Sequence, residues 1–214
     1  MQKMFGRVLI LFAFAATETA FSLELPVADP KFKQCLQQLA TKHHWSRPED
    51  FTEVVCHNKD IVSVEGINDF QNIAKLSLYK NTISNLNLIN LKQLKHLNVA
   101  KNALESITLN NLSTLSELYL FNNNLHKLTL ENMPALSQVK VNSNQLTSVN
   151  FKHLGALAKL YLFDNKLEHL DIKTIPSLKY IDVRQNPMPD EFYDELDAQS
   201  GLTALHDGNS EDWQ

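Results

Sequence analysis

Leucine and other aliphatic residues recur along this chain at a fixed step of 21 residues. Six successive segments between residues 73 and 186 share one pattern, as in Leu115-x-x-Leu118-x-Leu120-x-x-Asn123-x-Leu125. The alternation of inward leucines with outward residues is typical of a short β-strand that has one buried face. Because one such strand cannot bury its apolar side alone, the pattern predicts a stack of repeats joined in a parallel sheet.

An asparagine follows the strand pattern in every segment, where the chain must turn across the stack. The six positions are Asn81, Asn102, Asn123, Asn144, Asn165 and Asn186. A side-chain amide both donates and accepts, so it can satisfy backbone groups that the turn leaves buried. We therefore expect this ladder to be structural rather than a binding site.

The second half of each segment carries another alternating pattern. It reads Leu86-x-Leu88, Ile107-x-Leu109, Leu128-x-Leu130, Val149-x-Phe151 and Leu170-x-Ile172. These stretches are too short and too alternating for a helix of three turns. They predict short extended or β segments on the opposite, convex side of the stack.

The two ends of the chain depart from the repeat, as a solenoid requires to shield its core. Asp29-Pro30 predicts the start of a cap helix whose apolar face includes Phe32 and Leu36. Trp45 and Phe51 are expected to plug the first turn. After the last repeat, residues 190–198 predict a short amphipathic helix.

The first residues are typical of a secretory signal. Lys3 and Arg7 precede an apolar run at 8–16 that is too short to span a bilayer, and Ala20-Phe21-Ser22 is a cleavage pattern. A buried N-terminal helix is the alternative. We predict four parts: a signal peptide (1–22), an N-terminal helical cap (23–60), a leucine-rich repeat domain (61–188) and an acidic C-terminal cap and tail (189–214). We expect a secreted or periplasmic protein that does not span a membrane.

The chain has two cysteines, Cys35 and Cys56, which predict one disulfide in an exported protein. A bond between them would staple the cap helix to the stack and contribute about 3 kcal/mol. Metal binding is a weaker alternative, because two cysteines beside the single neighbouring His57 do not complete a tetrahedral site. We expect no metal site.

The repeat matches the leucine-rich repeat pattern and resembles that of secreted bacterial leucine-rich repeat proteins, the group that includes the internalins. The resemblance covers residues 54–188, from the lead-in Ile61-Val-Ser-Val-Glu-Gly-Ile67 through Leu76-x-Leu78-x-x-Asn81. It implies a β-rich solenoid with a curved parallel sheet on the concave face, short extended convex segments and a helical cap at each end. It also implies partner binding on the concave face, but no particular partner.

Aromatic side chains gather on the predicted concave face. Six of its 18 outward positions are aromatic, whereas the ten convex outward positions include none. Aromatics recur at 79, 121 and 163 and alternate with Ala100, Asn142 and Arg184, which predicts ridges about 9.6 Å apart. Lys140 lies between Tyr119 and Tyr161, where a cation–π contact is expected. Two alternatives are duplication of a two-repeat unit and aromatic packing that serves stability alone.

Aromatic anchors are common at interfaces, so we predict partner contact on this face. The predicted partner-binding residues are Tyr79, Tyr119, Phe121, Lys140, Asn142, Tyr161, Phe163, Tyr180 and Arg184. The partner class that fits best is a protein or peptide, including one on a host or cell surface. The alternatives are a carbohydrate or cell-envelope binding module and a secreted virulence effector.

Composition narrows the remaining classes. The net charge of −4, with 20 basic and 24 acidic residues, argues against nucleic acid as the partner. The chain lacks a glycine-rich phosphate loop and the H-E-x-x-H motif, and His43-His44 is its one histidine cluster. We therefore predict no catalytic residues, no cofactor and no enzyme activity.

Overall fold

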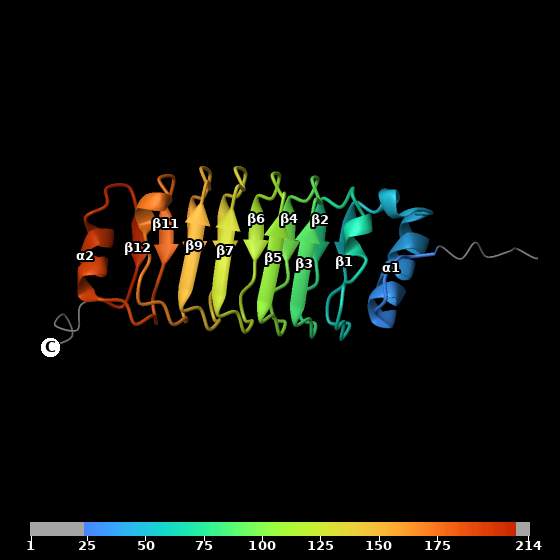
Figure 1. The fold of residues 1–214 in the computed structure, drawn as a ribbon, viewed down its shortest axis with the longest axis horizontal. Coiled ribbons are helices and arrows are strands. Elements are labelled where there is room, and N and C mark those ends of the chain that lie inside the picture. The colour runs from blue at the N-terminus through green and yellow to red at the C-terminus, as the bar shows by residue number, and fades with distance from the viewer. Residues whose placement is uncertain (1–23, 209–214) are drawn as a thin grey trace, which may run out of the picture.

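Six repeat strands, flanked by one further strand at each end, form an eight-stranded parallel sheet within residues 24–208, the part of the chain that this computed structural model describes (Figure 1). The predicted signal peptide lies outside the described residues. The strands, in their order across the sheet, are β1 (Glu53–Val55), β2 (Lys75–Ser77), β4 (His96–Asn98), β6 (Glu117–Tyr119), β8 (Gln138–Lys140), β10 (Lys159–Tyr161), β11 (Tyr180–Asp182) and β12 (Thr203–Leu205). Equivalent repeat positions pair, as Leu97 does with Leu118, so the outward columns of the sequence are real columns on the sheet.

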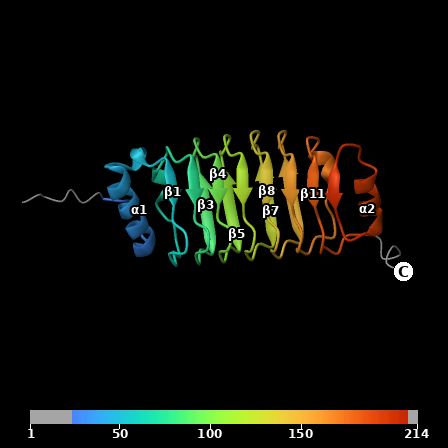
Figure 2. The same ribbon diagram turned by 180° about the vertical axis from the view of Figure 1, so that it is seen from behind.

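The convex layer also contains strands, as the second alternating pattern predicts. They are β3 (Asn85–Ile89), β5 (Ser106–Asn110), β7 (Lys127–Glu131) and β9 (Ser148–Lys152). They run opposite to the strands of the main sheet (Figures 1 and 2). The prediction is wrong for the last unit, where η3 (Ile172–Thr174) is a single 3₁₀ turn. The Asp171 carboxylate accepts from the Lys173 N–H there, which favours a capped turn over a strand.

The convex strands pair two by two instead of forming one sheet. β3 bonds to β5 and β7 bonds to β9, and a hollow of about 320 Å³ separates β5 from β7. Side-chain hydrogen bonds just after these strands join the same two pairs. Asn111 Nδ2 donates to Asn90 Oδ1 at 2.9 Å, and His153 Nδ1 bonds to Asn132 Oδ1 at 2.8 Å. The 42-residue alternation of the sequence is therefore visible on the convex side as well.

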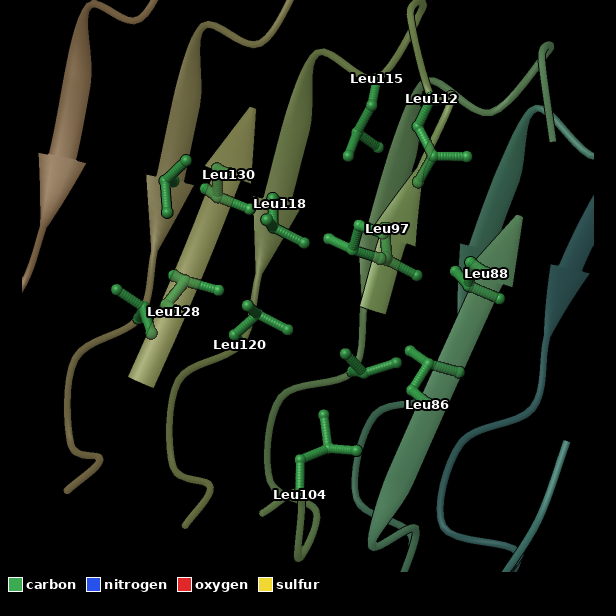
Figure 3. Packing of buried hydrophobic residues seen from close by; sticks show 14 of the residues in the cluster. Leu86, Leu88, Leu97, Leu104, Leu112, Leu115, Leu118, Leu120, Leu128 and Leu130 are labelled. Atoms are coloured by element: carbon green, nitrogen blue, oxygen red, sulfur yellow. The ribbon is translucent and has the colours of Figure 1, made fainter. Parts of the chain in front are cut away.

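The core lies between the two layers and consists of inward leucines and related residues. Figure 3 shows leucines of the main sheet facing leucines of the convex strands, including Leu97, Leu118, Leu120, Leu86, Leu88, Leu128 and Leu130. Leu118 and Leu120 are fully buried. Each repeat adds one such layer to a continuous core, so the stack rather than the single repeat is the unit of stability.

The asparagine ladder binds each repeat to the one before it. Asn123 Oδ1 accepts from the Leu104 N–H at 2.9 Å, while Nδ2 donates to the carbonyls of Val99 and Leu120. The other five asparagines repeat this arrangement. Every rung therefore joins two consecutive turns, and the prediction of a structural ladder is confirmed.

The N-terminal cap is helix α1 (Pro30–His43), followed by two single turns, η1 (Pro48–Asp50) and η2 (Ile67–Asp69). Asp29 Oδ1 accepts from the N–H groups of Lys31 and Phe32, and Oδ2 accepts from those of Val62 and Ser63. One carboxylate therefore caps the helix and ties it to the lead-in segment. Burial alone would raise the pKa of Asp29, but these four hydrogen bonds outweigh burial and lower it.

The predicted disulfide is present between Cys35 on α1 and Cys56 just after β1, with a Cα–Cα distance of 6.0 Å. At the other end, α2 (Asp190–Asp197) covers the core with Phe192, Tyr193 and Leu196. The predicted leucine-rich repeat solenoid with a helical cap at each end is confirmed. The sequence did not predict β12, which extends the main sheet beyond the last repeat.

Replacing one rung of the ladder should destabilise the whole stack. In Asn123→Ala, one N–H and two carbonyl groups lose their partner inside the core, so we expect the free energy of unfolding to fall by about 3 kcal/mol or more. Urea denaturation followed by circular dichroism measures the loss. The matched control is Asn124→Ala at the exposed neighbouring position, where we expect a change within about 0.5 kcal/mol. Equal losses in the two variants would contradict the role of the ladder.

Removing the Asp29 carboxylate should weaken the cap in a pH-dependent way. Asp29→Ala should lower the free energy of unfolding by about 1–2 kcal/mol at neutral pH. Since the pKa is lowered in the folded state, this contribution is present above the ordinary value of 3.8 and is lost as the pH falls through the folded pKa. Denaturation at a series of pH values should show the two proteins converging in acid. The control is Asp69→Ala, which removes an exposed carboxylate and should leave stability nearly unchanged. If the difference in unfolding free energy between the unmodified protein and Asp29→Ala were the same at every pH, the linkage would be refuted.

Candidate functional site

All nine predicted partner-binding residues lie on or just after the strands of the main sheet and point away from its leucines. We call the outward side chains of β2, β4, β6, β8, β10 and β11, with the side chain two residues after each of these strands, the sheet face. Each aromatic ring of the sheet face is half-buried. Within residues 24–208 the exposed large hydrophobic side chains are Val62 and Leu205, of which Leu205 on β12 pairs with Asp182 at the end of the main sheet.

The first aromatic pair closes over a small residue. The rings of Tyr79 and Phe121 lie 6.5 Å apart, much closer than the predicted spacing of separate ridges. They lean toward each other across Ala100, which is fully buried. Alanine permits this approach because its side chain leaves the space between the two rings empty. The Lys101 ammonium lies 5.5 Å from the centre of the Tyr79 ring.

A lysine is held between two tyrosines at the middle of the sheet face. The Lys140 ammonium lies 5.4 Å from the Tyr119 ring centre and 4.9 Å from the Tyr161 ring centre, so the expected cation–π contact is confirmed. Tyr161 in turn packs against Tyr180 in a tilted arrangement, with ring centres 5.0 Å apart. We call these four residues the Lys140 centre. The arrangement follows from register, because Tyr119, Lys140 and Tyr161 are paired neighbours on three adjacent strands.

A hydrogen-bond network fixes one side of the Lys140 centre. The Tyr119 hydroxyl donates to Glu117 Oε2 at 2.6 Å and accepts from Gln138 Nε2 at 2.8 Å. His96 Nδ1 lies 3.3 Å from the same carboxylate. Burial, followed by the bond to Glu117, raises the pKa of Tyr119 to about 12. The Tyr119 hydroxyl lowers the pKa of Glu117, so this carboxylate remains charged over the physiological range.

Beside this network lies a hollow of about 290 Å³, which sequence reasoning missed. It is lined by Lys75, Leu76, Ser77, His96, Leu97, Asn98, Glu117 and Tyr119. The hollow exists because Ser77 and Asn98 occupy the column in which the next units carry Tyr119 and Lys140. The change from small to large side chains along this column is visible in the sequence, and the hollow could have been predicted from it. Ser77 bonds to His57 at 2.7 Å, and burial lowers the pKa of that histidine.

The far end of the sheet face carries an ion pair. Arg184 Nε and a terminal nitrogen bond to both oxygens of the buried Asp182 at 2.9 and 2.7 Å, and the guanidinium lies 5.8 Å from the Phe163 ring centre. The sequence assigned Asp182 no partner. Asn142 stays apart from the aromatic contacts and bonds through its amide to Ser143. The nine predicted residues therefore share one face but form three clusters with Asn142 between them.

Neither a metal-binding cluster nor a membrane-spanning helix is found in the described part of the chain. Residues 24–208 contain no group of three His, Cys, Asp or Glu side chains placed to hold a metal ion. Their helices are all too short or too polar to cross a membrane. The contacts of the sheet face instead join rings and cations, an arrangement suited to binding.

The ionisation of Tyr119 offers a direct test of the network. Free tyrosine ionises near pH 10, whereas Tyr119 should remain protonated to about pH 11 because of burial and the Glu117 carboxylate. NMR of proteins with ¹³C-labelled tyrosine resolves the five tyrosines individually. In Glu117→Gln the Tyr119 signal should begin to titrate at lower pH, although burial still keeps its pKa raised. An unchanged Tyr119 titration in this variant would argue against the hydrogen bond.

Comparisons with known proteins support the fold. No protein-family model and no curated protein matches the chain. Among solved structures, internalin C2 from Listeria monocytogenes has a TM-score of 0.54 at 18% identity and covers 86% of this chain and 96% of its own. YopM from Yersinia pestis, described as a leucine-rich effector protein, has a TM-score of 0.60 at 20% identity, with 87% and 56% covered.

A third structure, TLR13 in complex with ssRNA13, has a TM-score of 0.55 at 23% identity and covers 72% of this chain and 24% of its own. Identities this low establish the fold and leave the partner open. The structures that this chain resembles come from proteins of very different length. The chain is a leucine-rich repeat solenoid, as its sequence predicts, and it is similar in fold to an internalin and to YopM.

Proposed function

We propose that this chain is an exported, non-catalytic binding protein, of the secreted bacterial type, that holds a protein or peptide partner against the sheet face. The observation that carries the proposal is the clustering of rings and cations on one layer of the solenoid. Tyrosine, phenylalanine and arginine supply most of the binding energy in many protein interfaces. The convex layer is built by the same repeats, but its outward side chains are polar, mostly Asn, Thr, Ser and Lys, and do not include aromatic rings.

Contacts within the site favour a protein or peptide over a glycan. A sugar that stacks on a ring needs a free ring face. Lys101 lies over Tyr79, Lys140 over Tyr119 and Tyr161, and Arg184 over Phe163. Because these cations occupy a face of four of the six rings, fewer ring faces are available to a sugar, and the cations offer charged donors that suit polypeptide groups better.

Secretion or periplasmic export is the setting that fits the chain. The signal pattern at residues 1–22 motivates this proposal, and the Cys35–Cys56 disulfide is consistent with an oxidising compartment. The similarity in fold to internalin C2 and YopM also fits an exported protein, including an effector that acts on a host.

The test is a crosslinking pull-down from the native extracellular or periplasmic milieu. Changing Tyr119, Phe121, Tyr161 and Phe163 to Ser should weaken partner capture by more than about 100-fold, because several anchors are lost together. The circular dichroism spectrum should remain that of a solenoid, since the leucine core and asparagine ladder are untouched.

A matched control changes four outward residues of the convex strands, Asn87, Thr108, Thr129 and Asn150, to Ser. This variant should capture the partner as the unmodified protein does. Equal loss in both variants would move the interface away from the sheet face. A glycan array that finds a ligand dependent on the same four aromatics would replace the protein partner with a carbohydrate.

A further inference from the structure

The Lys140 ammonium is a positioned cation whose hydrogen-bonding capacity is not used by the solenoid. Two ring faces hold it in place, while the ammonium carries three N–H donors. Within residues 24–208 it joins no salt bridge and no hydrogen bond, although Glu117 interacts with it through space. A charged donor that is half-buried and already ordered loses little freedom when it binds an acceptor from solution.

The surroundings of this cation favour an anionic group. The 18 outward positions of the strands contain four basic residues and two acidic ones, on a chain whose net charge is −4. One of the acids, Asp182, is buried and already paired with Arg184. Lys159 lies on the strand next to Lys140. The Tyr161 hydroxyl makes no hydrogen bond to the described residues and is available as a second donor.

The hollow beside Tyr119 has the opposite character. Its charged groups already have partners, since Lys75 bonds to Glu53 at 2.6 Å and His96 pairs with Glu117. An incoming charge would compete with these pairs, whereas an uncharged side chain would not. A volume of about 290 Å³ is at the lower end for ligand pockets, which suits one side chain.

The spacing between these two features matches an extended peptide. The hollow is centred on β4 and Lys140 lies on β8, two strand positions away in the sheet. Two strand spacings are about 9.6 Å. In the extended polyproline II conformation, with three residues per turn, residues i and i+3 lie on the same side of the chain, about 9.3 Å apart. A peptide crossing the strands would therefore reach both features with residues i and i+3.

We propose that the sheet face recognises an acidic peptide segment, with a Glu or Asp carboxylate at Lys140 and Tyr161 and an uncharged side chain three residues away in the hollow. This inference rests on the proposed function and specifies the chemistry of its partner. The carboxylate accepts from the Lys140 ammonium and the Tyr161 hydroxyl, and the two tyrosine rings shield that contact from water. Charge-assisted hydrogen bonds of this kind are the stronger ones in protein recognition.

The probe is the peptide Ser-Ser-Leu-Ser-Ser-Glu-Ser-Ser, titrated into the ¹⁵N-labelled protein and followed by NMR. We expect shifts at Lys140, Tyr161 and the residues that line the hollow. Replacing Glu by Gln in the peptide, or Lys140→Gln in the protein, should weaken binding about tenfold or more. Lys140→Arg should retain most of the affinity, and Tyr161→Phe should weaken binding several-fold without affecting the fold.

The matched control is Lys127→Gln, which makes the same charge change on convex strand β7 and should leave binding unchanged. Failure of the unmodified protein to bind the peptide, or equal affinity for its Glu and Gln forms, would overturn the proposal. So would tighter, Lys140-dependent binding of a uronic-acid oligosaccharide.

The pull-down variants separate this inference from the proposed function. A native partner that is lost with the four aromatic-to-Ser changes, but held normally by Lys140→Gln, would leave the proposed function intact and overturn the acidic-peptide assignment. A partner held by both variants would overturn both proposals.

Discussion

The solenoid depends on one recurring set of hydrogen bonds, in which a buried asparagine amide joins two consecutive turns. Without that amide, the N–H of one turn and the carbonyls of two would face an apolar core unpaired, at a cost of roughly 1–3 kcal/mol each. Because the amide spans a fixed distance, it also fixes the step from one turn to the next. The residue before each asparagine, such as Lys101 or Asp164, adopts a left-handed backbone with φ near 55°. The turn thus tolerates an unfavourable conformation that non-glycine residues seldom adopt, because the ladder and the core hold it in place.

This constraint separates the residues that build the molecule from those available for binding. Inward leucines and ladder asparagines repeat in every turn, while the outward positions vary without disturbing the stack. The constant step then turns sequence into surface geometry, since residues 21 positions apart become neighbours on the sheet. Lys140, for example, lies 21 residues from both Tyr119 and Tyr161, and its ammonium therefore lies between the two rings. The small residues Ser77 and Asn98, at the same interval, produce a hollow.

The sequence could predict features that depend on local alternation and on the repeat step. These include the strands, the ladder, the N-cap at Asp29 and the pairing of Cys35 with Cys56. Features set by side-chain rotation were beyond it, such as the tilt of Tyr79 and Phe121 over Ala100 and the bidentate contact of Arg184 with Asp182. Strand β12 was missed because Thr203-Ala-Leu205 lacks both the asparagine and the leucine framework of a repeat. It forms a strand because the edge of β11 is available to pair with it.

The division of the convex layer into two pairs of strands has a mechanical consequence. Bending the molecule between β5 and β7 would break no hydrogen bond between convex strands. Bending between β3 and β5, or between β7 and β9, would strain several such bonds. The compliant position therefore falls behind the boundary between β4 and β6, close to the hollow and one strand from Lys140. Flexing there would change the separation of these two features while leaving each intact. The solenoid is in this sense two stiff blocks joined by a continuous sheet, and the joint lies directly behind the proposed partner-binding surface.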